Sequence, residues 1–192
     1  FVPIHWTDAT ASRARVGDLV APATDPISGQ PALKSTRAAI VPFPARLYGY
    51  AVSTAPIARP PGSYWAAAAI AAGQAAEAVA DGNAPELVTT GEAPEPFIAG
   101  EALEFAQTTA PVDRQTFAAT LLGRDDLIGV IDEAAGSARF AAFDGTRLAC
   151  AVYLAEAPVE ASRAFVTRQL GQQVARADIL AGRPSADRPD PG

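Results

Sequence analysis

Three apolar runs in the second half of the chain form its clearest pattern. The short connections "AAGS" and "GT" join them, and short glycine-containing connections are typical of β-hairpins. We therefore expect three consecutive antiparallel strands, a meander. The runs are "LIGVIDE" (127–133), "ARFAAFD" (138–144) and "RLACAVYLA" (147–155).

Helical patterns flank this meander. In "VDRQTFAATLLGRDD" (112–126) apolar residues recur at helical spacing, and Gly123 follows them as at a helix end. The segment 157–172 is amphipathic with Pro158 in its first turn, and a short helix is expected near 174–181. The pattern predicts an α+β unit, with a three- or four-stranded sheet that carries helices on one face.

An alanine-rich segment is the strongest helix prediction. "SYWAAAAIAAGQAAEAVADG" (63–82) has Ser63 at an N-cap position and Gly82 after its last apolar residue. Alanine also has the highest helix propensity. The proline-rich segment 44–62 has no periodicity and predicts a linker. Segment 83–111 is rich in Pro, Glu and Gly and includes one short expected strand, "ELVTT".

The first 45 residues form a separate block in this interpretation. "FVPIHW" (1–6) and "STRAAIVPF" (35–43) predict strands, 7–20 predicts a short helix, and 21–34 is a turn-rich loop. A start without methionine and a tail rich in Pro and Asp lead us to expect a piece of a larger protein. The expected class is mixed α/β, divided into 1–45, a linker 46–62, a domain 63–182 and a tail 183–192.

Composition favours an acidic globular protein. The chain has 192 residues, of which 49% are hydrophobic, enough for a core. A net charge of −6 without a basic run argues against nucleic-acid or anionic membrane partners. No apolar run approaches the roughly 18–20 residues that span a bilayer. The single cysteine, Cys150, excludes an intrachain disulfide and favours a reducing, cytoplasmic compartment.

Few residues offer catalytic or metal chemistry. With His5 and Cys150 as the sole residues of their types, the chain alone cannot build a usual zinc or iron–sulfur site. His5 is open to three interpretations: acid–base catalysis, contact with a ligand, or a core position. Asp125 and Asp126 at a helix–strand turn indicate solvated residues rather than a catalytic pair. Cys150 between alanines indicates an inert buried thiol.

The loop "DPISGQPALK" (25–34) ends in Lys34, the one lysine of a chain with fourteen arginines. A loop of Pro, Gly and Ser exposes backbone N–H and C=O groups, which suits a polar heterocycle or a phosphate. Lys34 would add a point charge to such a site. The alternative is a surface turn with a solvated lysine.

Residues 1–43 resemble the C-terminal cofactor-binding domain of molybdopterin oxidoreductases, and look most like bacterial assimilatory nitrate reductase catalytic subunits. The motifs "VPIHW" and "DPISGQPALK" carry the resemblance. The remaining chain is similar, in order, to the segment that these reductases place before a Cys-rich iron–sulfur module. The resemblance implies that 1–45 close a six-stranded double-psi β-barrel that binds bis-molybdopterin guanine dinucleotide.

The resemblance also implies individual cofactor contacts. Lys34 matches a lysine with which relatives contact the cofactor. Gly17 falls where many relatives have asparagine, so that contact is lost, shifted to Asp18 or made by backbone. Gln30 is a further expected neighbour of the cofactor. The residues expected near the pterin and the substrate funnel are His5, Trp6 and Thr7, and Ile4 or His5 falls near a position with which some relatives face the substrate.

The implied activity is the reduction of nitrate to nitrite at molybdenum, with electrons from iron–sulfur centres and an electron-donor protein or reductase subunit. This chain contains neither the cysteines of the cluster nor a molybdenum ligand, so alone it is not expected to be active. Two alternatives stay open. One is a sister enzyme such as a formate dehydrogenase or a periplasmic-type nitrate reductase. The other is a non-catalytic docking module, in which the meander and its helices contact an electron-transfer partner.

Overall fold

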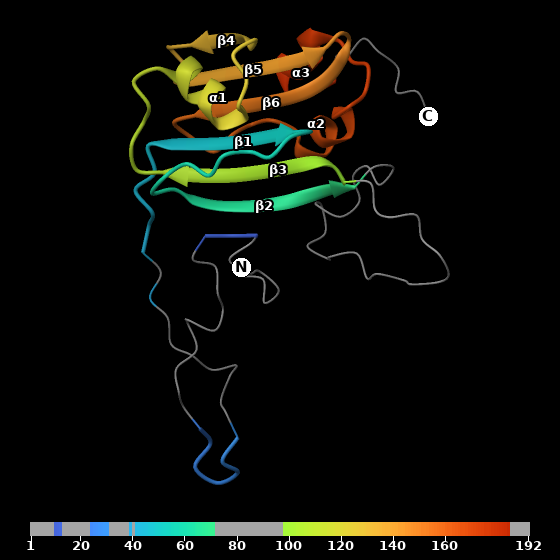
Figure 1. Cartoon of the computed structure of the whole chain (residues 1–192). Coiled ribbons are helices and arrows are strands. Elements are labelled where there is room, and N and C mark those ends of the chain that lie inside the picture. Colours follow the sequence, from blue (N-terminus) through green and yellow to red (C-terminus); the bar gives the residue numbers. More distant parts are fainter. Residues whose placement is uncertain (1–9, 13–23, 31–38, 40, 72–97, 185–192) are drawn as a thin grey trace, which may run out of the picture.

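A six-stranded antiparallel sheet is the centre of the fold (Figure 1). The computed structural model describes residues 10–12, 24–30, 39, 41–71 and 98–184. The strand order is β2-β3-β1-β6-β5-β4, so the sheet has more strands than the three or four expected, although the mixed α/β class is confirmed. The elements are β1 (Leu47–Ser53), β2 (Tyr64–Ala71), β3 (Ile98–Gln107), α1 (Arg114–Leu122), β4 (Ile128–Asp132), β5 (Ser137–Asp144), β6 (Arg147–Ala155), α2 (Arg163–Gln169) and α3 (Arg176–Ala181).

The predicted meander is confirmed, because β4, β5 and β6 pair in succession and antiparallel. The helix α1 is confirmed as well. The Asp113 side chain accepts hydrogen bonds from the first turn, and Gly123 ends the helix in the left-handed region at φ 65°. The helix α2 begins later than expected: its N-cap is Ser162, and Pro158 lies before it. The short helix near 174–181 is α3.

Two predictions in the first half of the described region are wrong. Residues 64–71 form strand β2 rather than a helix, since pairing with β3 along eight positions overrides the helix propensity of alanine. Residues 47–53, expected within a linker, form β1, a strand in the middle of the sheet. The prolines around 47–53 lie outside the strand and do not interrupt its ladder.

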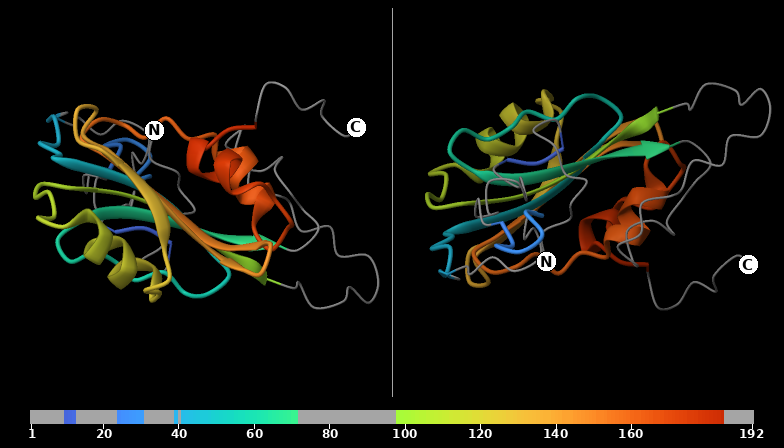
Figure 2. Two further views of the ribbon diagram at one scale, coloured as in Figure 1. Left: turned by 90° about the horizontal axis from the view of Figure 1, so that it is seen from above. Right: turned by 90° about the horizontal axis from the view of Figure 1, so that it is seen from below.

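The helices cover both faces of the sheet rather than one (Figure 2). Side chains of β6 alternate between the faces: Val152 and Leu154 belong to the cluster around α1, and Tyr153 to the cluster around α2 and α3. A strand buried on both faces has no polar side, which explains why 147–155 reads as a continuous apolar run.

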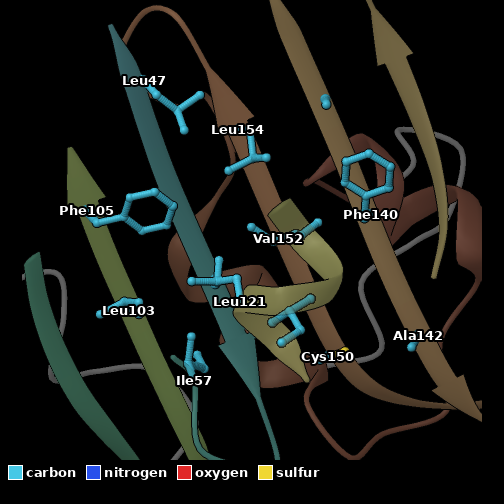
Figure 3. Close-up of a cluster of buried hydrophobic side chains, with 14 residues drawn as sticks. Leu47, Ile57, Leu103, Phe105, Leu121, Phe140, Ala142, Cys150, Val152 and Leu154 are labelled. Carbon is cyan, nitrogen blue, oxygen red and sulfur yellow. The ribbon is translucent and has the colours of Figure 1, made fainter. Parts of the chain in front are cut away.

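The buried cluster on the α1 side is the larger of the two cores of the described chain (Figure 3). Leu47 of β1, Leu103 and Phe105 of β3 and Leu121 of α1 meet there, and each is at most 4% exposed. Gly49 lies opposite Phe105 on the neighbouring strand, and a Cβ at Gly49 would lie 2.1 Å from the Phe105 ring. Glycine therefore lets the ring cross β1 and fill the core.

Several predicted elements fall largely or wholly outside the described residues. These are the strands 1–6, 35–43 and "ELVTT", the helix 7–20, and the tail 183–192. Where these segments are described, two predictions are wrong: residues 10–12 bridge to β2 and are not helical, and 41–43 are not part of a strand. No helix in the described part of the chain is both long and apolar enough to cross a membrane.

Replacing Leu121 by alanine tests the packing of α1. Leu121 is 3% exposed, so Leu121→Ala should lower the free energy of unfolding by about 2–5 kcal/mol through lost burial and the cavity left behind. Urea denaturation followed by circular dichroism measures this. The control is Thr120→Ala on the exposed side of the same helix, with a change within about 1 kcal/mol. Equal effects of the two substitutions would contradict the packing.

Candidate functional site

The turn at Asp25–Gln30 is organised by one carboxylate. The Asp25 Oδ1 atom accepts the N–H groups of Ile27 at 3.0 Å and Ser28 at 2.7 Å, and the Ser28 hydroxyl at 3.0 Å. Pro26 presets the backbone at the second turn position, and Gly29 has φ 69°. The hydrogen bonds, first from the Ser28 N–H, hold the pKa of Asp25 below its ordinary value.

The N–H groups of this turn are all used inside it. Besides those of Ile27 and Ser28, the Gly29 N–H donates to the Asp25 carbonyl at 2.9 Å and the Gln30 N–H donates to Ser28 Oγ at 3.3 Å. The expectation that these N–H groups are available to a phosphate is therefore wrong for residues 27–30. The Asp25 carboxylate also repels an anion. Residues 24–30, Gln30 among them, are all exposed.

Of the expected cofactor and substrate residues, the structure describes Gln30. It lies on the turn, which projects away from the sheet (Figure 1). The other expected residues lie outside the described part of the chain, so the roles of all of them stay predictions. Those outside the described residues are Ile4, His5, Trp6, Thr7, Gly17 and Lys34.

Residues 10–12 attach the N-terminal block to the edge of the sheet. Ala11, 1% exposed, bridges to Ala66 of β2. The Ala67 N–H donates to the Thr10 carbonyl at 2.7 Å, and the Ser12 N–H donates to the Trp65 carbonyl at 2.9 Å. The Trp65 N–H in turn donates to Ser12 Oγ at 2.8 Å. This short segment extends the sheet beyond β2.

Beside this edge, Arg59 and Glu101 form a partly buried ion pair against Trp65. The Arg59 guanidinium donates to both carboxylate oxygens of Glu101, with one contact at 3.1 Å, and lies 4.8 Å from the centre of the Trp65 ring. The Ile57 N–H also donates to Glu101 Oε2, at 3.0 Å. Burial alone would raise the pKa of Glu101, but the hydrogen bonds from Arg59 and Ile57 outweigh it and lower that pKa.

An open pocket of about 350 Å³ adjoins this pair. Its walls are mainly small apolar residues, and its one ionised side chain, Glu101, is already bound by Arg59 and Ile57. Such walls suit packing of an apolar group rather than bond-breaking chemistry. The lining residues are Thr10, Ala55, Pro56, Ala67, Ala68, Ala69, Gly100 and Glu101.

Sequence reasoning missed the Arg59–Trp65–Glu101 cluster, because it assigned these residues to a linker, a helix and a loop. A signal was present in "EALEFAQ" (101–107), where Glu101, Leu103 and Phe105 alternate with their neighbours at the period of a strand. Recognising β3 there would have predicted a strand partner for the apolar run of β2.

The remaining reactive side chains have structural surroundings. Asp126 pairs with Arg124 at 2.7 Å, Arg124 also pairs with Asp144 at 2.9 Å, and Asp125 is exposed. Cys150 is 1% exposed, and burial raises the pKa of its thiol, which disfavours the reactive thiolate. Among the described residues, no group of three His, Cys, Asp or Glu side chains is placed to hold a metal ion.

Comparison with known proteins gives a partial likeness. A nitrate reductase of Klebsiella oxytoca is 40% identical to this chain over 65 residues. The match covers 34% of this chain and 8% of that protein, so the chain spans only a small part of its curated relative. No family model and no solved structure matches the chain. The likeness links the chain loosely to nitrate reductases and agrees with the resemblance of its motifs.

Glu101→Gln tests the ion pair. The substitution should lower the free energy of unfolding at pH 7 by about 1 kcal/mol, because the pair is partly exposed and screened. Since folding lowers the pKa of Glu101, its stabilisation is present above the ordinary value of 4.5 and is lost as the pH falls through the folded value. The deficit of the variant should therefore shrink below pH 4.5 in urea titrations. Exposed Glu160→Gln is the control, and a deficit of Glu101→Gln that is independent of pH would contradict the assignment.

Asp25→Ala tests the turn. Removing the acceptor should speed solvent exchange of the Ile27 and Ser28 amides, measured by NMR, while Asp25→Asn, which keeps an acceptor oxygen, should retain most protection. Because the folded pKa of Asp25 is lowered, the native turn should keep its full protection above the ordinary value and fall toward the protection of Asp25→Asn as the carboxylate is protonated at lower pH. Equal exchange rates in all three proteins would show that the carboxylate does not organise the turn.

Proposed function

We propose that this chain is the cofactor-binding C-terminal portion of a molybdenum nitrate reductase that reduces nitrate to nitrite. The observation that carries the proposal is the 40% identity to a nitrate reductase over 65 residues. The motifs "VPIHW" and "DPISGQPALK" also support it, since they resemble the cofactor-binding domain of molybdopterin oxidoreductases. In this proposal residues 1–45 contribute to a double-psi β-barrel.

The cofactor would be bis-molybdopterin guanine dinucleotide, which when bound supplies the molybdenum that takes an oxygen atom from nitrate. The described turn fits a contact through the exposed Gln30 side chain, and not through its own N–H groups. Lys34 would supply the positive charge that a phosphate requires. His5, Trp6 and Thr7 would line the pterin, Gly17 would approach through backbone, and Ile4 would face the substrate.

The sheet would serve this site as a support. Residues 10–12 lie between Thr7 and Gly17 in sequence, and their backbone is bonded to β2. A cofactor-binding segment tied to a sheet edge at this point loses less conformational entropy on binding than a free one. Electrons would come from iron–sulfur centres and a donor protein or reductase subunit outside this chain.

Lys34→Ala in the intact protein that contains this chain tests the assignment. The variant and the native protein are purified from a host that makes the molybdenum cofactor. We expect at least about a tenfold loss of molybdenum and guanine nucleotide per polypeptide, with unchanged circular dichroism, because one charged contact contributes roughly 1.5–3 kcal/mol. Exposed Arg168→Ala on α2 is the control.

Two results distinguish a wrong assignment of Lys34 from a wrong proposal for the function. Full molybdenum content and full nitrate reduction in Lys34→Ala would refute the role of Lys34 alone. Native protein that contains neither molybdenum nor guanine nucleotide would refute the proposed function as a whole.

A further inference from the structure

The two edge strands of the sheet differ in whether a described segment pairs with their outer side. At one edge, β2 is bridged by residues 10–12. At the other, β4 pairs with β5 on one side, and no described segment pairs with its outer side. In Figure 1 β4 forms the top of the sheet, with no other element above it. An outer strand in this position presents unpaired backbone N–H and C=O groups to solvent.

Apolar side chains accompany this open backbone. Val130 is 54% and Ile131 is 42% exposed. They point to opposite faces, since Ile131 lies opposite Ala138, which belongs to the α1 core, and Val130 lies opposite Arg139. A strand added beside β4 would therefore cover one apolar side chain on each face of the sheet.

Acidic residues flank the strand at both ends. Asp125 and Asp126 precede it, and Asp132 and Glu133 end or follow it. Neighbouring arginines compensate these charges only in part. Arg124 is shared by Asp126 and Asp144, and Arg114 is shared by Glu133 and Glu156. Each shared arginine leaves one negative charge, and Asp125 and Asp132 add to it.

We propose that β4 binds an extended segment of a partner protein, with apolar residues at its centre and basic residues at both ends, as an added strand of the sheet. Backbone hydrogen bonds would supply affinity, while Val130, Ile131 and the flanking acids would supply selectivity. The proposal does not depend on the function proposed above.

The charges also argue against a second copy of this chain as the occupant. Antiparallel pairing of two β4 strands would place Asp132 and Glu133 of one copy beside Asp125 and Asp126 of the other. Parallel pairing would place each acidic end beside its equivalent. Like charges meet in both orientations, which disfavours self-association and leaves a basic partner as the complementary one.

Two labelled heptapeptides serve as probes for the full chain. Both have alternating valine and threonine at the centre; one has arginine at each end and the other glutamate. At five residues β4 is roughly 17 Å long, which a heptapeptide covers. We expect fluorescence anisotropy to show at least about tenfold tighter binding of the arginine peptide at low salt, weakening as salt is added. Hydrogen exchange should slow at 128–132 and not at 64–71.

Two substitutions test the surface. Val130→Lys should weaken binding of the arginine peptide about tenfold or more, because it removes an apolar contact and adds a like charge. Val112→Lys, at a fully exposed valine before α1, is the matched control and should bind as the native protein does. Asp125→Lys should narrow the difference between the two peptides.

The proposal is overturned if the two peptides bind equally, or if Val130→Lys binds the arginine peptide as well as the Val112→Lys control. Sedimentation analysis of the native chain tests whether a second copy of the chain binds to β4 instead. A concentration-dependent dimer of the native chain that Val130→Lys abolishes would identify a second copy, and not a basic segment, as the partner of β4.

Discussion

The antiparallel pairing of β1 with β6 is the contact on which the rest of the structure depends. It runs from Tyr48 opposite Ala155 to Ser53 opposite Cys150, and it joins β2-β3-β1 to β6-β5-β4. Each half alone would be a three-stranded sheet with an exposed side at the join. Paired, both strands become central and are buried on both faces, so each side of the sheet needs its own helical cover. The helix α1 supplies one cover, and α2 with α3 supplies the other.

Burial on both faces also determines how the polar groups near this join are satisfied. Tyr50 and Tyr153 face each other across it, with ring centres 6.3 Å apart. The Tyr50 hydroxyl lies 2.8 Å from Thr167 Oγ1, and the Tyr153 hydroxyl bonds to the Ile179 carbonyl. Burial raises the pKa of both phenols, so they stay neutral. The hydrogen bonds connect α2 and α3 to the central strands. They fix the orientation of these helices on the sheet, which apolar packing alone would leave less well defined.

The sequence predicted best where local and tertiary preferences agree. The meander 127–155 combines apolar runs with glycine-containing turns, and α1 combines helical spacing with Asp113 and Gly123 at its ends, so both were predictable. In β2 they disagree: its alanines favour a helix, whereas the ladder with β3, a partner separated from it by more than twenty residues, requires a strand. The candidate site was least predictable, because the Asp25 carboxylate takes up N–H groups that composition alone left open to a ligand.

The proposed cofactor-binding block and the proposed partner lie at opposite edges of the sheet, the block at β2 and the partner at β4. The edge at β2 is occupied by residues 10–12 of the chain itself, and Arg46, just before β1, donates its N–H to the Gln107 carbonyl of β3 at 2.8 Å. Among the described residues, the attachments at 10–12 and at Arg46 are therefore both on the β2-β3-β1 half. The strand β4 ends the other half, with β3, β1, β6 and β5 between it and β2. A partner strand at β4 would extend the sheet without displacing the N-terminal block. Binding of the partner strand and retention of a cofactor by the block would therefore be independent of each other, unless the β1–β6 pairing itself were to change.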